Sequence, residues 1–489
     1  ANYGQWLGSD YMFAKLNLNP DQRLKRLGDD FYEQRLVLEQ ITGLTGRKYL
    51  DADLDNGMDQ YRAMMDGGVS EAGRLQLTVG IALSAEQMAA LDEDIVWMVA
   101  QNVGGQQVLV PVVYLSQATA DRLQLGGAAI AGESVDIRAN NVNNQGMITA
   151  DYRLSVDAGS LLNDRGAMTS GGSLRVSAVE DIINKDGLIQ GGSISLVAGR
   201  DLQSVASLGV ARIESTGGLE LVAGRDLSLV GAQTSAKGNA ALQAGRDLNL
   251  TTQQSGANGE LFNRTTLDVG GSLGLQAGNN LTLTAVQVKA GNGLSAVAGN
   301  DINLNVLSTE QTSRYKNTES TRQTLQTSGL EAGGSMALQA GQDVNLNAAN
   351  LTAGNALAVV AGRDLNVGEV TTTDTSSTDI RRKRYSQQTQ TLDQTVHGST
   401  IKAGGDIALV AGQDATLTSA GVYSEGGTVA VSAGRDVVLA TADEEHTFEQ
   451  DTWRKKKKTF SSTTTTTRET SSDTYAVGTT LSGDGVQIA

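Results

Sequence analysis

Apolar and polar residues alternate over most of the chain after about residue 125, in short runs such as LSL, LNL, LTL, ISLVAG and LELVAG. Alternation with a period of two residues puts every second side chain on the same face, as in strands that bury one face. The pattern therefore predicts a long series of short strands that share a common apolar interior.

A short Gly-containing phrase recurs between these runs, in forms such as AGRDL, AGNDI, AGQDV and AVEDI. Successive spacings of its Asp position are 20, 25, 21, 33, 21, 42, 21, 50 and 22, so the basic period is close to 21 residues. A second phrase, NxxG, occurs at 143–146, 163–166 and 184–187. The Asp position of the first phrase is occupied by Asp181, Asp201, Asp226, Asp247, Asn280, Asp301, Asp343, Asp364, Asp414 and Asp436.

A period of 21 residues suits three short strands joined by turns, which is one circuit of a parallel β-helix. Each circuit advances by one strand spacing of about 4.8 Å and stacks side chains on their own kind. Leucine-rich repeats have a similar length, but their Asn-containing consensus and helical half are missing. The fold prediction is a mainly β protein, a right-handed parallel β-helix of twelve to fourteen circuits over residues 121–441.

The repeated phrase is interpreted as a structural corner. Gly is expected to supply a positive φ or a tight corner, and Asp to accept hydrogen bonds from turn amides. A column of carboxylates about 4.8 Å apart would repel, so each Asp needs hydrogen bonds or a cation. The cations that lie beside the column in sequence are Arg200, Arg225, Arg246, Arg363 and Arg435.

Two chemical roles of the Asp column, calcium binding and catalysis, are alternatives to the structural one. Calcium-binding nonapeptide repeats need acidic residues at nine-residue spacing, whereas this chain has one per 21. A polysaccharide-cleaving β-helix would need clustered acids, and no nucleophile–base motif or phosphate loop is present. We therefore expect no catalytic residue, metal site, cofactor or small-molecule substrate, and no enzymatic activity.

The first 120 residues differ from the rest, since they hold ten of the nineteen aromatic residues and both prolines. They predict a small, mainly helical domain with a terminal strand at 108–115. One helix is expected to begin at Asn19-Pro20 and end at Gly43, and a second to end at Gly67. A third, with a capping box formed by Ser84 and Gln87, is expected to extend its apolar stripe to Met98.

The long spacings between phrases indicate insertions near 251–266, 307–329 and 370–399, and a fourth within 442–489 before a further circuit begins. They fall in every second circuit, lengthen toward the C-terminus and are rich in Thr, Ser and Gln. We expect each to be a two-stranded hairpin leaving the same side of the stack; disordered loops are the alternative.

Two basic clusters lie near the expected hairpin turns of an otherwise acidic chain, whose formal charge is −16. This balance makes nucleic-acid binding unlikely. The clusters fit solvated hairpin tips or a contact with an acidic surface such as lipopolysaccharide, anionic lipid or a glycan. Their members are Arg381, Arg382, Lys383 and Arg384, and Trp453, Arg454, Lys455, Lys456, Lys457 and Lys458.

With these phrases and insertions, residues 125–489 resemble the filamentous haemagglutinin family, giant exoproteins of Gram-negative bacteria exported by two-partner secretion. The text WLGSDYMFAKLNLNPDQRLKRLGDDFYEQRLV and DIVWMVAQNV resembles the segment that precedes the later haemagglutinin-repeat block, including in effectors of contact-dependent growth inhibition. The start of the chain has no signal-peptide pattern and no cysteine occurs, so an internal piece of a secreted protein is expected.

The resemblance implies a non-enzymatic segment of a secreted cell-surface filament, held at the outer membrane or in the periplasm until deployment. Its partners would be a target-cell outer membrane or surface receptor and, for the parent protein, a dedicated outer-membrane transporter. Two roles remain open: helping a C-terminal toxin across the outer membrane of a target bacterium, or forming the stalk and binding surface of an adhesin.

Overall fold

The structure is a computed structural model of the 489-residue chain. It describes residues 8–18, 25–45, 50, 57–103, 106–119, 129–207, 209–255 and 261–489. The chain divides into two compact units. The first comprises residues 1–132, 144–149 and 165–168, and the second comprises 133–143, 150–164 and 169–489.

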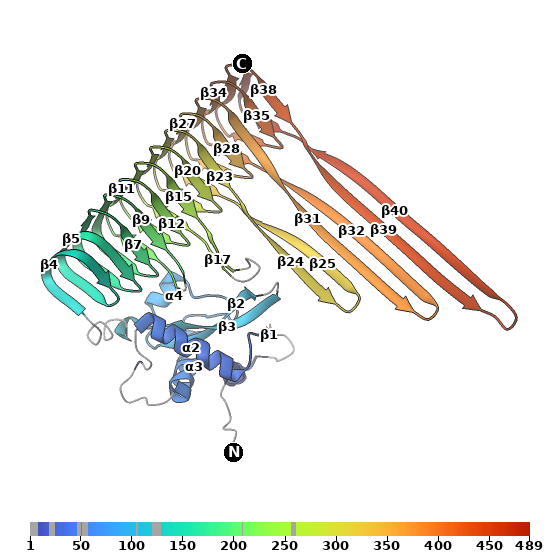
Figure 1. The fold of residues 1–489 in the computed structure, drawn as a ribbon, viewed down its shortest axis with the longest axis horizontal. Helices are drawn as coiled ribbons and strands as arrows, with labels where there is room; N and C mark the ends of the chain where they lie inside the picture. The colour runs from blue at the N-terminus through green and yellow to red at the C-terminus, as the bar shows by residue number, and fades with distance from the viewer. Residues whose placement is uncertain are drawn as a thin grey trace. The chain divides into compact units, whose positions relative to one another are not determined.

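The second unit is a parallel β-solenoid with about 14 turns at a spacing of about 21 residues, which confirms the predicted fold class (Figure 1). β4 (Ala129–Asn144) and β6 (Ala167–Ala178) are among its earliest strands. Most later circuits contribute one strand to each of three columns in which every strand pairs in parallel with the next circuit. The first column contains β8 (Leu188–Ala198), β10 (Arg212–Ser215), β13 (Gln233–Ala236), β18 (Thr266–Val269), β21 (Gln287–Ala290), β26 (Gly329–Ala332), β29 (Asn350–Ala353), β33 (Thr400–Ala403), β36 (Gly421–Ser424) and β41 (Thr480–Ser482).

The other two columns follow the same rule, and β8 is long enough to serve the second column as well. The second column continues with β11 (Leu219–Ala223), β14 (Ala240–Ala244), β19 (Leu273–Ala277), β22 (Leu294–Ala298), β27 (Met336–Ala340), β30 (Leu357–Ala361), β34 (Ile407–Ala411), β37 (Thr428–Ala433) and β42 (Gly485–Ile488). The third contains β5 (Met147–Asp164), β7 (Ile182–Lys185), β9 (Leu202–Val205), β12 (Leu227–Val230), β15 (Leu248–Thr251), β20 (Leu281–Thr284), β23 (Ile302–Asn305), β28 (Val344–Asn347), β31 (Leu365–Arg382), β35 (Ala415–Thr418) and β38 (Val437–Ala440).

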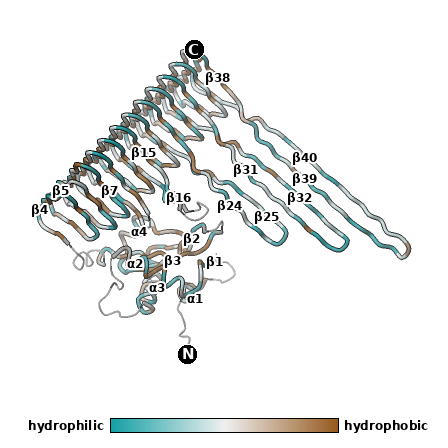
Figure 2. Tube along the Cα trace, in the orientation of Figure 1, coloured by the Kyte–Doolittle hydropathy of each residue, from teal (hydrophilic) through white to brown (hydrophobic). Residues whose placement is uncertain are grey.

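The interior of the solenoid is built from like residues stacked on like. Leu250, Leu283 and Leu304 occupy the same register position in successive circuits, and all are fully buried. Figure 2 shows the alternation of hydrophobic and hydrophilic residues along these strands. The period-two pattern of the sequence is therefore the burial pattern of the solenoid.

Of the two roles expected for the corner glycines, the structure shows the tight corner and not the positive φ. None of those in the AGxD phrases has a positive φ. Instead, a Cβ on Gly224 or Gly245 would lie 2.1 or 2.2 Å from the carbonyl oxygen of the corner glycine one circuit earlier. Glycine is thus needed because neighbouring circuits approach closely at this corner, and the expected left-handed backbone is wrong.

The first unit combines helices with a small sheet. Its strands β1 (Lys25–Arg26), β3 (Gln106–Tyr114) and β2 (Ile95–Val103) lie in the order β1-β3-β2, and its helices are α1 (Ser9–Lys15), α2 (Asp30–Thr45), α3 (Gly57–Arg74) and α4 (Ala85–Ala89). Met12, Phe13, Ile41, Tyr61 and Trp97 are in its core. Unlike the solenoid interior, this core has no column of like residues stacked in register.

Two of the predicted helices have different bounds. α2 starts at Asp30, and the expected cap at Asn19-Pro20 lies outside the described residues. α3 continues through Gly67 and Gly68. A Cβ on either glycine would lie 2.8 Å from a carbonyl oxygen of Asp94 or Val96, so these glycines allow α3 to pack closely on the chain leading into β2. They do not end the helix.

The third predicted helix is largely wrong. The capping box exists, since the Gln87 N–H donates to Ser84 Oγ and the Ser84 N–H donates to Gln87 Oε1. However, the helix ends at Ala89, and Ile95 and Met98 lie on β2, paired antiparallel with β3. The β-branched and aromatic run IVWMV favours a strand once β3 is available as a partner. The domain therefore has a two-stranded hairpin where one terminal strand was expected.

Candidate functional site

Four hairpins leave the solenoid where the third column turns toward the first, in every second circuit. The shortest is β16 (Gln253–Ser255) with β17 (Leu261–Asn263). The next three lengthen steadily: β24 (Leu307–Tyr315) with β25 (Thr318–Gln326), the outer part of β31 with β32 (Tyr385–Gly398), and β39 (Ala442–Lys457) with β40 (Ser462–Val477). The prediction of hairpins leaving one side is confirmed, and all four lie close to the predicted insertions.

The three long hairpins join into one antiparallel sheet, which was not predicted (Figure 1). β25 pairs with β31 over residues 318–321 and 375–378, and β32 pairs with β39 over 385–393 and 446–454. The strand order is therefore β24-β25-β31-β32-β39-β40. In both junctions the second strand of one hairpin binds the first strand of the next.

The spacing of the insertions explains why the hairpins fit side by side. Two circuits of the solenoid advance by about 9.6 Å, and one hairpin contributes two strands with a combined width of about 9.6 Å. An insertion in every second circuit therefore places each hairpin one strand spacing from the next. Insertions in every circuit would crowd the hairpins, and insertions in every third circuit would leave a gap.

Both faces of this hairpin sheet are polar. One face carries hydroxyl pairs such as Thr318–Thr378 at 2.9 Å and Ser320–Ser376 at 3.1 Å across a junction. On the same face His446 Nδ1 lies 3.2 Å from Asp393 Oδ1 across the other junction. The long hairpins are predominantly hydrophilic in Figure 2. Hydrogen bonds, and not apolar burial, hold this sheet together.

A hydroxyl side chain closes the base of each long hairpin, a feature that the sequence reasoning missed. Ser328 is fully buried; its Oγ accepts from the Val286 N–H at 3.3 Å and lies 2.8 Å from the Asn305 carbonyl oxygen and 3.1 Å from that of Leu283. Ser399 and Thr479 make the equivalent three contacts after the other long hairpins. We call these three residues the base hydroxyls.

The base hydroxyls have a signal in the sequence. Each stands two residues before an inward-facing apolar residue of the first column, as Ser328 does before Leu330. In circuits without an insertion, the same position holds Val286, Ala349 or Ala420. A hydroxyl is required only where the chain departs into a hairpin, because the departing backbone leaves groups that need a partner.

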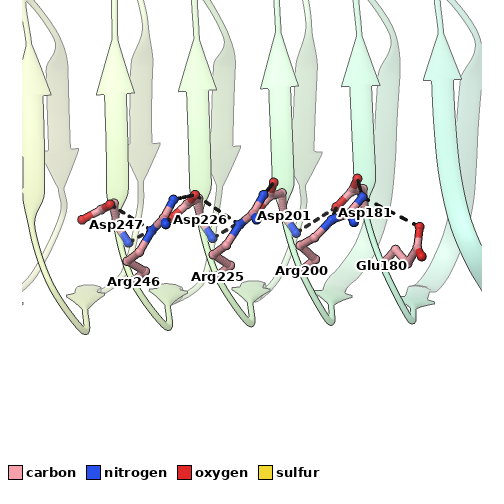
Figure 3. Close-up of polar contacts among 8 residues, drawn as sticks. All are labelled: Glu180, Asp181, Arg200, Asp201, Arg225, Asp226, Arg246 and Asp247. Carbon is pink, nitrogen blue, oxygen red and sulfur yellow. Dashed lines mark hydrogen bonds and ion pairs between the residues drawn. The ribbon is translucent and has the colours of Figure 1, made fainter.

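The predicted corner column forms a ladder of ion pairs from Asp181 to Asp247 (Figure 3), and further pairs lie in later circuits. Each corner Arg donates through Nε to the Asp of the preceding circuit, at 2.7–2.8 Å, in the pairs Arg200–Asp181, Arg225–Asp201, Arg246–Asp226, Arg363–Asp343 and Arg435–Asp414. The same carboxylates accept from the N–H of the Asp one circuit later, as Asp226 Oδ1 does from Asp247 N at 3.3 Å. Asn280 accepts the corresponding N–H of Asp301 at 3.2 Å without carrying charge.

The cations change the acidity of this column. The hydrogen bonds from Arg200, Arg363 and Arg435 hold the pKa values of Asp181, Asp343 and Asp414 below their ordinary value of 3.8. Partial burial opposes this shift but does not cancel it. At Asp181, Asp343 and Asp414 the ionised carboxylate is therefore stabilised by the Arg of the next circuit.

The structure brings the two predicted basic clusters together at the hairpin tips. Arg381 to Arg384 surround the turn between β31 and β32, and Tyr385 pairs with Arg454 on the neighbouring strand. The Lys455 N–H donates to the Arg384 carbonyl oxygen at 2.9 Å. Trp453 lies beside Ser386 in the same junction, whereas Lys456, Lys457 and Lys458 extend beyond it toward the last turn.

In the described part of the chain, no three His, Cys, Asp or Glu side chains are arranged to hold a metal ion. No described helix has the length and apolar character needed to cross a bilayer.

Comparison with known families agrees with this architecture. The hemagglutinin repeat model matches residues 209–260, 255–320, 311–383 and 381–489, which is more than half of the chain. The chain belongs to the hemagglutinin repeat family. The matches cover the solenoid circuits that carry hairpins, so the hairpin sheet is part of the hemagglutinin repeat segment itself.

Similar curated proteins are much longer than this hemagglutinin repeat chain. The tRNA nuclease CdiA-2 of Burkholderia pseudomallei is 41% identical over 160 residues, which is 32% of this chain and 5% of that protein. The 16S rRNA endonuclease CdiA of Enterobacter cloacae is 38% identical over 160 residues, and the toxin CdiA of Yersinia pestis 39% over 157, each again with 32% and 5% coverage. No solved structure matches. The chain is thus a segment of a filamentous haemagglutinin-like exoprotein and spans about 5% of the relatives it matches.

Proposed function

We propose that this hemagglutinin repeat segment is a non-enzymatic part of a secreted surface filament that helps deliver a C-terminal toxin across the outer membrane of a target bacterium. The observation that carries the proposal is the hairpin sheet, whose hairpins lengthen in steps and end in basic turns on an acidic chain. The relatives named as nucleases and toxins support the delivery role, since each is a protein in which a similar segment is a small part.

The proposal gives the solenoid and the hairpins different tasks. The solenoid is a rigid rod with a continuous backbone hydrogen-bond network, suited to holding a filament at a fixed extension. The hairpin sheet is polar on both faces and projects from one side of that rod, where it can meet a partner. The parent protein would reach the cell surface through a dedicated outer-membrane transporter, as expected for two-partner secretion.

The second candidate is an adhesin in which the solenoid is a stalk and the hairpin sheet binds a receptor or glycan. The polar faces of the sheet favour this reading, because rows of Thr, Ser and Gln can hydrogen-bond to a carbohydrate. The two candidates differ in timing: an adhesin presents its sheet constantly, whereas a delivery segment presents it on contact with a target.

An epitope inserted between Thr459 and Phe460 would distinguish these candidates in the full-length parent protein on its producing cell. This turn is exposed, and it lies beyond the hairpin junctions; the turn at Asn317 is less suitable because its carbonyl oxygen accepts from the Asp379 N–H. For a delivery segment we expect the tag to resist added protease before contact and to fractionate with the target outer membrane afterward.

A matched tag in the solenoid corner at 237–239, which bears no hairpin, controls for general exposure of the filament. If the tag at Thr459 is digested equally before and after contact, and never fractionates with the target, the delivery role is wrong and a constitutive stalk remains. Attachment of producing cells to targets, measured in parallel, reports on the adhesin role alone.

A further inference from the structure

The hairpin turns concentrate positive charge that is not neutralised within the described residues. We define the tip band as residues 314–319, 379–385 and 454–461, which include the three long turns or the residues beside them. It contains eleven Lys and Arg residues and two acidic residues, a formal charge of +9, whereas the whole chain carries −16. The remainder of the chain therefore carries −25.

Ion pairing differs between the tip band and the solenoid. The two acidic residues of the band form ion pairs within it, Glu319 with Arg314 and Asp379 with Arg381. By contrast, Lys455, Lys456 and Lys457 face Thr464, Thr463 and Ser462 across the hairpin, and no carboxylate in the described chain pairs with them. Their charge is available to a partner, unlike the charge of the corner arginines.

Aromatic side chains accompany the cations at the turns. Tyr315 is 71% exposed with Lys316 Nζ 4.9 Å from its ring, and Phe460 is 100% exposed two residues after Lys458. Tyr385 directly follows Arg384. Aromatic rings beside cations suit the membrane–water interface, where rings lie at headgroup level and cations meet phosphates.

We propose that the tip band docks end-on to an anionic lipid leaflet, contacting its phosphate groups through lysines and arginines and its interface through Tyr315 and Phe460. The acidic solenoid does not prevent this contact. Strands of 16 residues, such as β39 and β40, hold the last turn about 50 Å from the solenoid, whereas charges are screened over about 8 Å at physiological salt. The leaflet repels the solenoid and attracts the tips, so this charge distribution favours a tips-first approach.

This inference rests on the proposed contact with a target outer membrane, but it can be tested without the parent protein's function. The purified 489-residue chain would be added to vesicles of phosphatidylcholine alone or with phosphatidylglycerol, and binding measured by co-sedimentation at low and high salt. We expect binding only to the anionic vesicles, and its loss at high salt.

A matched pair of variants assigns the binding to the tips. Replacing Lys455, Lys456, Lys457 and Lys458 by Gln should weaken binding at least about tenfold, since each basic residue near an anionic surface contributes about fivefold. Replacing Lys185, Lys237, Lys289 and Lys402 by Gln removes the same charge from exposed solenoid positions and should leave binding nearly unchanged. Phe460→Ser should cause a smaller loss of binding at low salt, because it removes an apolar contact and no charge.

Equal loss in both four-lysine variants, or equal binding to both vesicle types, would overturn the inference. Binding to a soluble sulfated glycan without binding to anionic vesicles would assign the tips to a carbohydrate instead. Because these vesicle measurements involve neither toxin nor target cell, their failure would leave the delivery proposal to be judged by the tag experiment.

Discussion

The solenoid and the hairpin sheet are both β-structures of one chain, but different forces hold them. The solenoid strands are parallel, bury one face and stack Leu250, Leu283 and Leu304 in one register. The hairpin strands are antiparallel, expose polar residues on both faces and meet through hydroxyl and backbone hydrogen bonds. Register is strongly specified where one face is buried and weakly specified in two-sided polar strands.

The hairpin sheet therefore takes its order from the solenoid. The two-circuit spacing of the insertions sets the distance between hairpins. The base hydroxyls lie where the chain returns from each long hairpin to the solenoid wall, just before β26, β33 and β41. A polar sheet with little apolar burial of its own can remain ordered because one end of every hairpin is anchored in the solenoid wall. Each prediction below changes one side of this comparison.

The largest effect is expected in the solenoid interior. Leu304→Ala should destabilise the circuits around β23 by about 2–5 kcal/mol, because a fully buried side chain is replaced by a cavity. Thr324→Ala, at an exposed position of the hairpin strand β25, should change stability by no more than about 0.5 kcal/mol. Hydrogen exchange of peptides from β23 and β25 measures both, and equal effects would remove the distinction between the two regions.

Close approach of circuits at the corner is tested by Gly245→Ala. The new Cβ would lie 2.2 Å from the Gly224 carbonyl oxygen, so the corner must open, at a cost of about 1–3 kcal/mol. Gly274→Ala is the matched control, because a Cβ there has no neighbour within 4 Å. Urea unfolding of the two variants should separate them; similar midpoints would show that the corner tolerates a side chain.

The base hydroxyls connect the two regions, and Ser328→Ala tests one of them. The substitution leaves the Val286 N–H without its acceptor and removes the hydroxyl hydrogen bond to the nearby carbonyl oxygens of Asn305 and Leu283, at a cost of about 1–3 kcal/mol. Ser328→Thr keeps the hydroxyl, as Thr479 does naturally after the last hairpin, and should be close to the parent. Proteolysis within 307–326 should accelerate in the Ala variant alone; acceleration in both would point to packing instead.

Removing the second long hairpin tests whether the sheet depends on adjacency. A chain in which 369–399 is replaced by the tight corner found at 348–349 should keep its solenoid stability, because 347 aligns with 368 and 350 with 400, so the stack stays continuous. The first and third long hairpins would each lose the junction with the second, and their backbone amides should exchange faster. Unchanged protection of β25 and β39 would show that each hairpin is ordered by itself.

Acid should produce the smallest effect, with opposite signs in the two units. The lowered pKa values of Asp181, Asp343 and Asp414 contribute stability that is present above 3.8 and is lost as pH falls through the lower folded values. In the first unit, burial raises the pKa of Glu33 above its ordinary 4.5, so acidification should stabilise that unit slightly. Hydrogen exchange resolved by unit between pH 5 and pH 3 measures both, and changes of the same sign would contradict the assignment.

Much of the solenoid was predictable because the same sequence pattern recurs in every circuit. The period near 21, the alternation of apolar residues and the AGxD phrases each report on local geometry that every circuit repeats. The first unit was predicted less well because its information occurs once. The capping box at Ser84 could be predicted from local sequence. The strand at 95–103 forms because it pairs with 106–114, whereas its apolar residues alone also fit one face of a helix.

The sequence by itself determined the circuit length, the buried residues, the positions of the hairpins and the basic character of their turns. Only the tertiary structure decided that the hairpins form one sheet, that the corner glycines are needed for contact between circuits, and that the base hydroxyls and the two basic clusters have their present neighbours. The reason is distance along the chain, because periodic patterns encode contacts within a circuit and between neighbouring circuits only. Thr318 and Thr378, like Tyr385 and Arg454, meet because stacking places every second circuit one hairpin width apart.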